Sequence, residues 1–146
     1  MKILVINGPN LNALGKRDKS YYGTKTLAQI NTLLEKEAKN LAANIISFQS
    51  NSESEIIDFI QKTAPSAAGI IINPGALTHY GLSLRDALVD SALPIVEVHL
   101  SNIYAREDWR AKSVIAPITR GQISGFGWRS YLAALQILVG ELKKEK

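Results

Sequence analysis

Apolar and polar residues follow two alternating patterns along this chain. Short runs of apolar, often β-branched residues are separated by longer segments in which apolar residues recur at helical spacing. Runs of the first kind are typical of strands that are buried on both faces of a parallel sheet. They predict strands at residues 2–7, 44–48, 69–73, 95–99 and 114–116.

The intervening segments have the spacing of amphipathic helices. Leu27, Ile30 and Leu34 lie on one face of the first of them. Ser52, with Glu55 three positions later, forms a capping-box pattern that marks the start of the second. The predicted helices cover residues 26–41, 52–64, 83–88, 106–112 and 128–142.

Strands and helices alternate throughout, β then α. This order predicts an α/β fold with a flavodoxin-like, doubly wound sheet of five parallel strands, in the order 2-1-3-4-5 with right-handed crossovers. The 146 residues suffice for one hydrophobic core and are too few for two ordinary domains, so we expect a single domain over residues 1–146. Residues 11–24 show neither the apolar runs of strands nor the spacing of helices, and we expect them to form a loop that acts as a lid.

Composition narrows the possible functions. The chain has no cysteine, which excludes disulfides, thiolate metal sites and cysteine nucleophiles. Its net charge is +4, but outside the lysine-rich end the basic residues are scattered without interleaved aromatic residues. This distribution favours a small anionic substrate over nucleic acid. The opening apolar run is too short for a signal peptide or a membrane span, so we expect a cytoplasmic protein without membrane partners.

Polar residues cluster where the predicted strands end. In the predicted order the carboxyl ends of the first, third and fourth strands are neighbours, and open α/β sheets bind ligands at this edge. The edge brings Asn10, residues 73–79 and residues 99–102 around one crevice. Neither a G-x-G-x-x-G motif nor a P-loop follows the first strand, which disfavours dinucleotides and nucleotide triphosphates. Two histidines without an acidic cluster also make a poor set of metal ligands, so no metal is expected.

Glu97 and His99 are two positions apart on one predicted strand. Their side chains therefore leave the same face of the sheet. The carboxylate is placed to orient the imidazole and to favour its protonated form, as a general acid requires. The alternative is a structural histidine at a strand end. For His79, which follows a Pro-Gly turn, a hydrogen-bonding role is the simpler interpretation.

Arg17 and Tyr22 lie five positions apart in the predicted lid. A guanidinium held against a phenol favours the phenolate, which is a stronger base than the neutral hydroxyl. The alternative is a surface arginine beside an aromatic residue that packs the loop down. Arg106 and Arg110, four apart on one predicted helix, repel each other unless an anion or a carboxylate lies between them, so one of them is a candidate substrate clamp.

Taken together, these features resemble the type II 3-dehydroquinate dehydratases, a family of flavodoxin-like enzymes. The resemblance covers nearly the whole chain. It rests on the motifs at residues 7–12, 14–17, 22–23, 73–76, 78–79, 84–87, 97–102 and 106–107. Two local departures follow Arg17 and His79, where this chain has Asp-Lys-Ser and Tyr-Gly.

The resemblance implies the reversible dehydration of 3-dehydroquinate to 3-dehydroshikimate through an enolate, without metal or other cofactor. It implies that Tyr22, held as phenolate by Arg17, removes the proton next to the ketone. Asn10 would help to hold a water that stabilises the enolate oxygen. His99, oriented by Glu97, would protonate the departing hydroxyl. The same reaction serves aromatic biosynthesis in the shikimate pathway and quinate breakdown.

The resemblance also implies substrate contacts. Ring hydroxyls would meet Asn73, His79 and Arg110, and the carboxylate would meet Leu100 and Ser101, including their backbone N–H groups. Asp86 matches a position that the family supplies from a neighbouring subunit. A homo-oligomer follows from that, in the family's usual form a dodecamer built from trimers.

Two other classes of function remain open from sequence alone. A flavodoxin-like binding or signalling module would use the same crevice without chemistry. A flavin or nucleotide carrier would need a phosphate-binding loop after the first strand, where Gly8-Pro9 offers few free backbone donors because proline has none.

Overall fold

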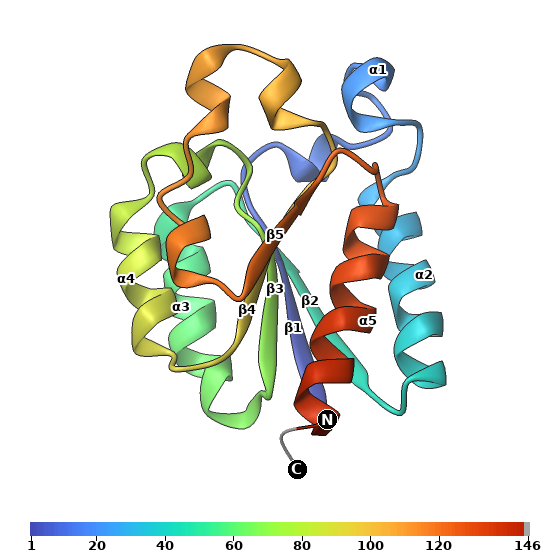
Figure 1. Ribbon diagram of the computed structural model, residues 1–146, viewed down its shortest axis with the longest axis vertical. Coiled ribbons are helices and arrows are strands. Elements are labelled where there is room, and N and C mark those ends of the chain that lie inside the picture. Colours follow the sequence, from blue (N-terminus) through green and yellow to red (C-terminus); the bar gives the residue numbers. More distant parts are fainter. Residues whose placement is uncertain (145–146) are drawn as a thin grey trace.

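Five parallel strands form one sheet in the order β2-β1-β3-β4-β5, as the sequence predicts (Figure 1). The computed structural model describes residues 1–144. The strands are β1 (Lys2–Asn7), β2 (Asn44–Gln49), β3 (Gly69–Asn73), β4 (Ile95–His99) and β5 (Gly121–Ser124). The central strands β3 and β4 are buried along their whole length, which explains the three isoleucines of β3 and the isoleucine and two valines of β4, and which also buries the polar residues Asn73, Glu97 and His99.

Helices cover both faces of the sheet (Figure 1). The long helices are α2 (Leu27–Asn40), α3 (Glu53–Thr63), α4 (Leu82–Asp90) and α5 (Arg129–Lys144). Alternate residues of β1 point to opposite faces, so Ile3 packs in the core under α2 and α5 while Leu4 packs in the core under α3 and α4. The predicted doubly wound class is therefore confirmed. No helix within residues 1–144 is long and apolar enough to cross a membrane.

The starts of α2 and α3 follow capping chemistry, with one departure from prediction. Thr26 and Gln29 form a complete capping box at α2. At α3, the hydroxyl of Ser52 accepts from the backbone N–H of Glu55 as predicted. The second half of that box is absent, because the carboxylate of Glu55 accepts from the hydroxyl of Ser50 and the N–H of Ser52 donates to the same hydroxyl. The hydroxyl of Ser50 thus bridges the N–H of Ser52 and the carboxylate of Glu55, which would bond directly in a complete capping box.

The fifth strand predicted at residues 114–116 is wrong. Ile115 instead fills the core beside α3 and α4, and the N–H of Val114 donates to the carbonyl of Thr78. The observed edge strand β5 contains a single large apolar residue, Ile123, so its sequence carries little strand signal. The apolar residues at 114–116 therefore pack against the sheet and do not form a strand.

Two further segments are more structured or more broken than expected. The predicted lid contains a 3-10 turn, Leu11–Ala13, and a four-residue helix, α1 (Lys19–Tyr22), whose start is capped by Asp18. The helix predicted at 106–112 is instead a 3-10 turn at Asp108–Ala111, preceded by another at Ile103–Ala105. Both segments lie beyond the carboxyl ends of the strands (Figure 1).

The loops after β1 and β3 approach each other closely. A Cβ on Gly8 would lie 2.4 Å from the carbonyl oxygen of Pro74, and one on Gly75, whose φ is +58°, would lie 2.9 Å from the carbonyl oxygen of Pro9. The N–H of Gly8 also donates to the carbonyl of Asn73 at 2.8 Å. Glycine at both positions lets the two loops form one floor at this end of the sheet.

We expect Gly8→Ala to lower the free energy of unfolding by about 1–3 kcal/mol, because the added methyl group meets rigid backbone and the loops must separate. Urea denaturation measures this. Gly140→Ala in α5 is the matched control, since a Cβ there meets nothing within 4 Å and alanine favours a helix by about 0.5–1 kcal/mol. A Gly8→Ala protein as stable as wild type would show that the close approach of the loops is unimportant.

Candidate active site

A cavity opens at the carboxyl ends of β1, β3 and β4, under α1 and the 3-10 turns that follow β4. Nine of the predicted site residues line it: Asn10, Arg17, Tyr22, Asn73, His79, His99, Leu100, Ser101 and Arg110. Glu97 lies behind His99 and contacts it. Asp86 lies on α4 away from the cavity, with 77% of its side chain exposed. One chain therefore brings together the predicted residues apart from Asp86.

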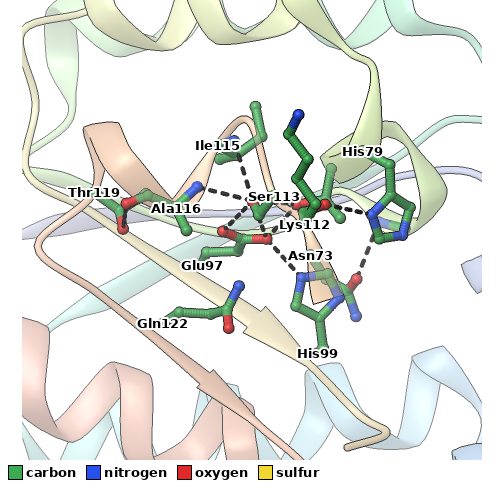
Figure 2. A network of polar contacts seen from close by, with 12 residues as sticks. Asn73, His79, Glu97, His99, Lys112, Ser113, Ile115, Ala116, Thr119 and Gln122 are labelled. Carbon is green, nitrogen blue, oxygen red and sulfur yellow. Dashed lines mark hydrogen bonds and ion pairs between the residues drawn. The ribbon is translucent and has the colours of Figure 1, made fainter. Parts of the chain in front are cut away.

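His99 and Glu97 form a buried pair on β4 (Figure 2). The Nε2 atom of His99 lies 2.6 Å from Oε1 of Glu97, and both side chains point to the same face of the sheet. Since the carboxylate accepts, the imidazole donates from Nε2. The ring nitrogen that Glu97 leaves free is Nδ1, and His99 is the member of the pair that lines the cavity.

Two hydroxyl groups contact the carboxylate of Glu97, and Figure 2 shows that of Ser113. Thr78, from the turn after β3, hydrogen-bonds to Oε1, and Ser113 lies 3.1 and 3.0 Å from Oε1 and Oε2. Burial alone would raise the pKa of Glu97. The hydrogen bond and charge of His99, with the hydroxyls of Thr78 and Ser113, outweigh burial and hold that pKa below its ordinary value. Glu97 is therefore stabilised as an ion inside the protein.

Tyr22 is enclosed by two arginines, one of which sequence analysis did not place in the site. The guanidinium of Arg17 stacks 3.8 Å from the centre of the Tyr22 ring, while Nη1 of Arg106 donates to its hydroxyl at 2.9 Å. The same Nη1 donates to the hydroxyl of Ser101 at 3.1 Å. Arg106 thus links α1 to the segment after β4. In the sequence, the close spacing of Arg106 and Arg110 was the feature that pointed to Arg106 as a site residue.

Arg110 has separate partners from Arg106. Its Nε donates to a carboxylate oxygen of Glu107, and its guanidinium lies 4.1 Å from the ring centre of Trp109. The hydrogen bond from Arg110 holds the pKa of Glu107 below its ordinary value. The predicted repulsion between the two arginines on one helical face is thus avoided, because the helix is broken into turns and each arginine faces different groups.

His79 is fixed at the rim of the cavity. Its Nδ1 lies 2.7 Å from the carbonyl oxygen of Lys112, and its ring packs edge-on against Trp109 at 5.1 Å between centres. A carbonyl only accepts, so Nδ1 donates and Nε2 is left as an acceptor in the neutral ring. The hydrogen-bonding role considered for His79 from its turn position is therefore observed.

A chain of hydrogen bonds lies below the cavity and fixes Asn73. The amide of Asn73 donates to the hydroxyl of Tyr131 at 2.9 Å, and Tyr131 donates to Oδ1 of Asn7 at 2.6 Å. Burial raises the pKa of Tyr131 far above its ordinary value, so this hydroxyl stays protonated as a donor. At the other side of the cavity, Asn10 adopts a left-handed conformation with φ of 69° and donates its N–H to Asn51 at 2.9 Å.

Comparison with known protein families gives a match that covers most of the chain. Residues 1–139 match the family described as dehydroquinase class II. The chain belongs to this family. It is 56% identical over 140 residues to the 3-dehydroquinate dehydratase of Roseiflexus castenholzii, covering 96% of this chain and 89% of that one. With the 3-dehydroquinate dehydratase of Halothermothrix orenii it shares 54% identity over 143 residues, 98% and 97% of the two chains.

The class II dehydroquinase fold is also seen in solved structures. The type II dehydroquinase of Butyrivibrio crossotus superimposes with a TM-score of 0.92 at 44% identity, covering 94% of this chain and 97% of that one. The predicted resemblance is therefore confirmed for the family and for the flavodoxin-like fold. The role of each site residue in this chain stays a prediction.

We expect the unfolding free energy of the wild type to decrease on acidification in part through Glu97. Its pKa in the folded chain lies below the ordinary value of 4.5 that applies to the unfolded chain, so folding favours the ionised form. The resulting stabilisation is complete above the unfolded pKa and is lost as the pH falls through the lower, folded pKa. Urea denaturation at a series of pH values below 6 measures the loss.

Glu97→Gln isolates this contribution, because the amide does not titrate. The stability difference between wild type and Glu97→Gln should shrink as the pH falls below 4.5. Glu35→Gln, at an exposed position of α2, is the matched control and should leave the pH dependence as in wild type. Parallel curves for wild type and Glu97→Gln would mean that Glu97 is not held as an ion by folding.

Proposed function

We propose that this class II dehydroquinase catalyses the reversible loss of water from 3-dehydroquinate, giving 3-dehydroshikimate, in the shikimate pathway of aromatic amino acid biosynthesis. The family match over residues 1–139 carries the reaction type. One structural observation supports it most directly. A tyrosine hydroxyl bound by a guanidinium and a histidine bound by a buried carboxylate line the same cavity.

Tyr22 is the base in this proposal. As phenolate it takes the proton from the carbon next to the ketone, and the electron pair of that C–H bond forms the enolate. Arg106, which donates to the hydroxyl at 2.9 Å, and Arg17, stacked on the ring, both stabilise the negative charge of the phenolate. Asn10, at the cavity wall, helps to hold a water that donates to the enolate oxygen.

His99 is the acid. When the enolate collapses, the C–O bond of the leaving hydroxyl breaks and the imidazolium gives its proton to that oxygen, which departs as water. Glu97 binds Nε2, so the proton leaves from Nδ1. Each turnover then ends with an extra proton on Tyr22 and one missing from His99, and exchange with solvent restores both.

Substrate contacts follow from the residues around this pair. Asn73, His79 and Arg110 offer polar groups for the ring hydroxyls, while Ser101 and the backbone near Leu100 receive the carboxylate. Asn73 is fixed by Tyr131 and His79 by Lys112, so neither needs to reorganise on binding. One domain over residues 1–146 would carry the whole reaction in the cytoplasm, with no cofactor, no nucleic acid partner and no membrane partner.

The assembly is the second part of the proposal. Asp86, exposed on α4, would complete the site of a neighbouring subunit, in a dodecamer built from trimers. Exposed apolar side chains on and beside the same helix support a covered face, since Tyr80, Leu82 and Val89 are 66%, 61% and 49% exposed. A symmetric homo-oligomer would bury them.

Purified wild type should produce a rise in ultraviolet absorbance with 3-dehydroquinate, because the product contains a conjugated enone. Tyr22→Phe keeps the ring stacked on Arg17 and removes the atom that takes the proton, so we expect turnover to fall by about 10²–10⁴-fold. Tyr21→Phe is the matched control, since it keeps the ring that lies 4.0 Å from Arg106 and leaves the hydroxyl of Tyr22 in place. Its turnover should match wild type.

Two results would contradict this proposal. Folded wild type that gives no enone signal would refute the dehydratase activity for this chain and favour a binding module. A folded Tyr22→Phe protein with wild-type turnover would refute Tyr22 as the base while leaving the reaction itself intact.

Mixing two inactive variants tests the shared site. Asp86→Ala subunits keep His99, and His99→Ala subunits keep Asp86, so refolding them together should restore about a quarter of wild-type activity if neighbours share Asp86. Asp90→Ala, at another exposed carboxylate of α4, is the matched control and should be fully active by itself. A mixture no more active than its parents would place Asp86 outside the shared site.

A further inference from the structure

The hydroxyl of Ser113 occupies the centre of the polar network behind His99 (Figure 2). Its oxygen accepts from the backbone N–H of Ile115 at 3.1 Å and from that of Ala116 at 2.9 Å. A hydroxyl oxygen has two lone pairs, and these two N–H groups fill both of them. Ser113 can therefore act toward any further group only as a donor.

Ser113 faces two acceptors in this network, the carboxylate of Glu97 and the hydroxyl oxygen of Thr78. Its oxygen lies 3.0 Å from Oε2 and 3.1 Å from Oε1 of that carboxylate. Thr78 also lies 2.8 Å from Ser113, but Ser113 has no lone pair left to receive its proton, so Thr78 donates to Glu97. The proton of Thr78 therefore points at the carboxyl group, and the proton of Ser113 supports the same carboxyl group either directly or through the oxygen of Thr78. A carboxyl group that only accepts is an ionised one.

His99 is then forced into one tautomer. With Glu97 accepting at Oε1, the ring must carry a proton on Nε2, and Nδ1 is the atom that exchanges protons with the cavity. The backbone turn at residues 113–116 therefore sets the direction of every hydrogen bond up to the imidazole. A neutral carboxyl at Glu97 would compete with this arrangement by donating a proton itself.

Few groups other than Ser113 contact Glu97 or lie close enough to affect its charge. The groups that contact it are His99 on its own strand, Thr78 from the turn after β3, and Ser113. Its neighbours in register on the flanking strands are Ile72 on β3 and Gln122 on β5, which are uncharged. Among residues 1–144, His99 is the one titratable side chain in contact with Glu97. Lys112, next to Ser113, is exposed and meets the site through its carbonyl group.

We propose that Ser113 is a positioning residue for the proton donor: its donor-only hydroxyl keeps Glu97 ionised and so fixes His99 with a proton on Nε2. The inference rests on the proposed dehydratase activity for its kinetic consequence. Its structural consequence, the tautomer of His99, is independent of any turnover. Ser113 also joins the proton donor to the segment that carries Arg110 and the carbonyl partner of His79.

Ser113→Ala removes the hydroxyl that donates to Glu97 and that accepts from the backbone N–H groups of Ile115 and Ala116. A hydrogen bond to a charged group is worth about 1.5–3 kcal/mol, so we expect kcat to fall by about 10–100-fold while KM stays within about twofold. With one donor fewer, Glu97 takes a proton more readily, so the low-pH loss of kcat should begin at a higher pH than in wild type. Ser113→Thr keeps the hydroxyl and should restore most of kcat and the wild-type pH profile.

Thr119→Val is the matched control. The Thr119 hydroxyl belongs to the same loop and donates to the carbonyls of Ala116 at 2.8 Å and Gly121 at 3.1 Å, without touching Glu97. Its loss loosens the loop, but kcat and its pH profile should stay as in wild type. If Ser113→Ala behaved like Thr119→Val in kcat and pH profile, Ser113 would have only a structural role and the proposal would be overturned.

Nitrogen-15 NMR of the two histidines tests the same proposal without substrate. At a pH where both rings are neutral, His99 should carry its proton on Nε2 and His79 on Nδ1, since they face a carboxylate and a carbonyl through those atoms. His99→Ala assigns the signals by removing one of them. A wild-type His99 protonated on Nδ1 would overturn the proposal, whether or not the protein dehydrates 3-dehydroquinate. Should Ser113→Ala fail to fold, this measurement on wild type can still overturn the proposal.

Discussion

The buried carboxylate of Glu97 is the constraint on which the rest of the site depends. A charge taken out of water without compensation costs several kcal/mol, so the chain must supply donors wherever such a group is kept. Here the donors come from three places, His99 on the same strand, Thr78 after β3 and Ser113 before β5. Satisfying one charge therefore holds two loops against the end of β4. Those loops carry His79 and Arg110. The hydrogen bonds of the Glu97 carboxylate therefore also help to position these two side chains at the cavity.

The second constraint is the close approach of the loops that follow β1 and β3 at the carboxyl ends of the strands. Parallel pairing of β1, β3 and β4 brings their carboxyl ends to one edge, and the absence of a side chain on Gly8 lets the loop after β1 meet Pro74. Below this floor, the buried hydroxyl of Tyr131 joins amides from β1 and β3. The acid and the hydroxyl-binding groups thus lie on rigid elements. Tyr22 differs, because it lies on a four-residue helix that is tied down by contacts of its own side chain.

Sequence patterns predicted the parts of this protein that depend on local periodicity. The predictions of the first four strands and of the main helices follow from apolar runs and helical spacing, and the pair of Glu97 and His99 follows from the alternation of side chains along a strand. The fifth strand failed because its apolar content is one residue, Ile123, while Ile115 imitates a strand residue by packing against the sheet. Ser113 was missed as part of the site, and Arg106 was considered only as the alternative to Arg110 for a substrate clamp. Spacing singled out the two arginines, but the contacts of Arg106 with Tyr22 and of Ser113 with Glu97 join residues distant in sequence and could not be predicted from it.

The charge around Tyr22 shows what kind of molecule the cavity is built to receive. Arg17 and Arg106 both lie against one tyrosine, and within residues 1–144 neither forms an ion pair with a carboxylate, whereas Arg110 is paired with Glu107. The buried Nε of Arg106 also has no hydrogen-bond partner among these residues. Two guanidinium groups against one tyrosine favour an anion in contact with them. The phenolate of the proposed base is one such anion and the carboxylate of the substrate is another, so binding and deprotonation both relieve the same excess of positive charge.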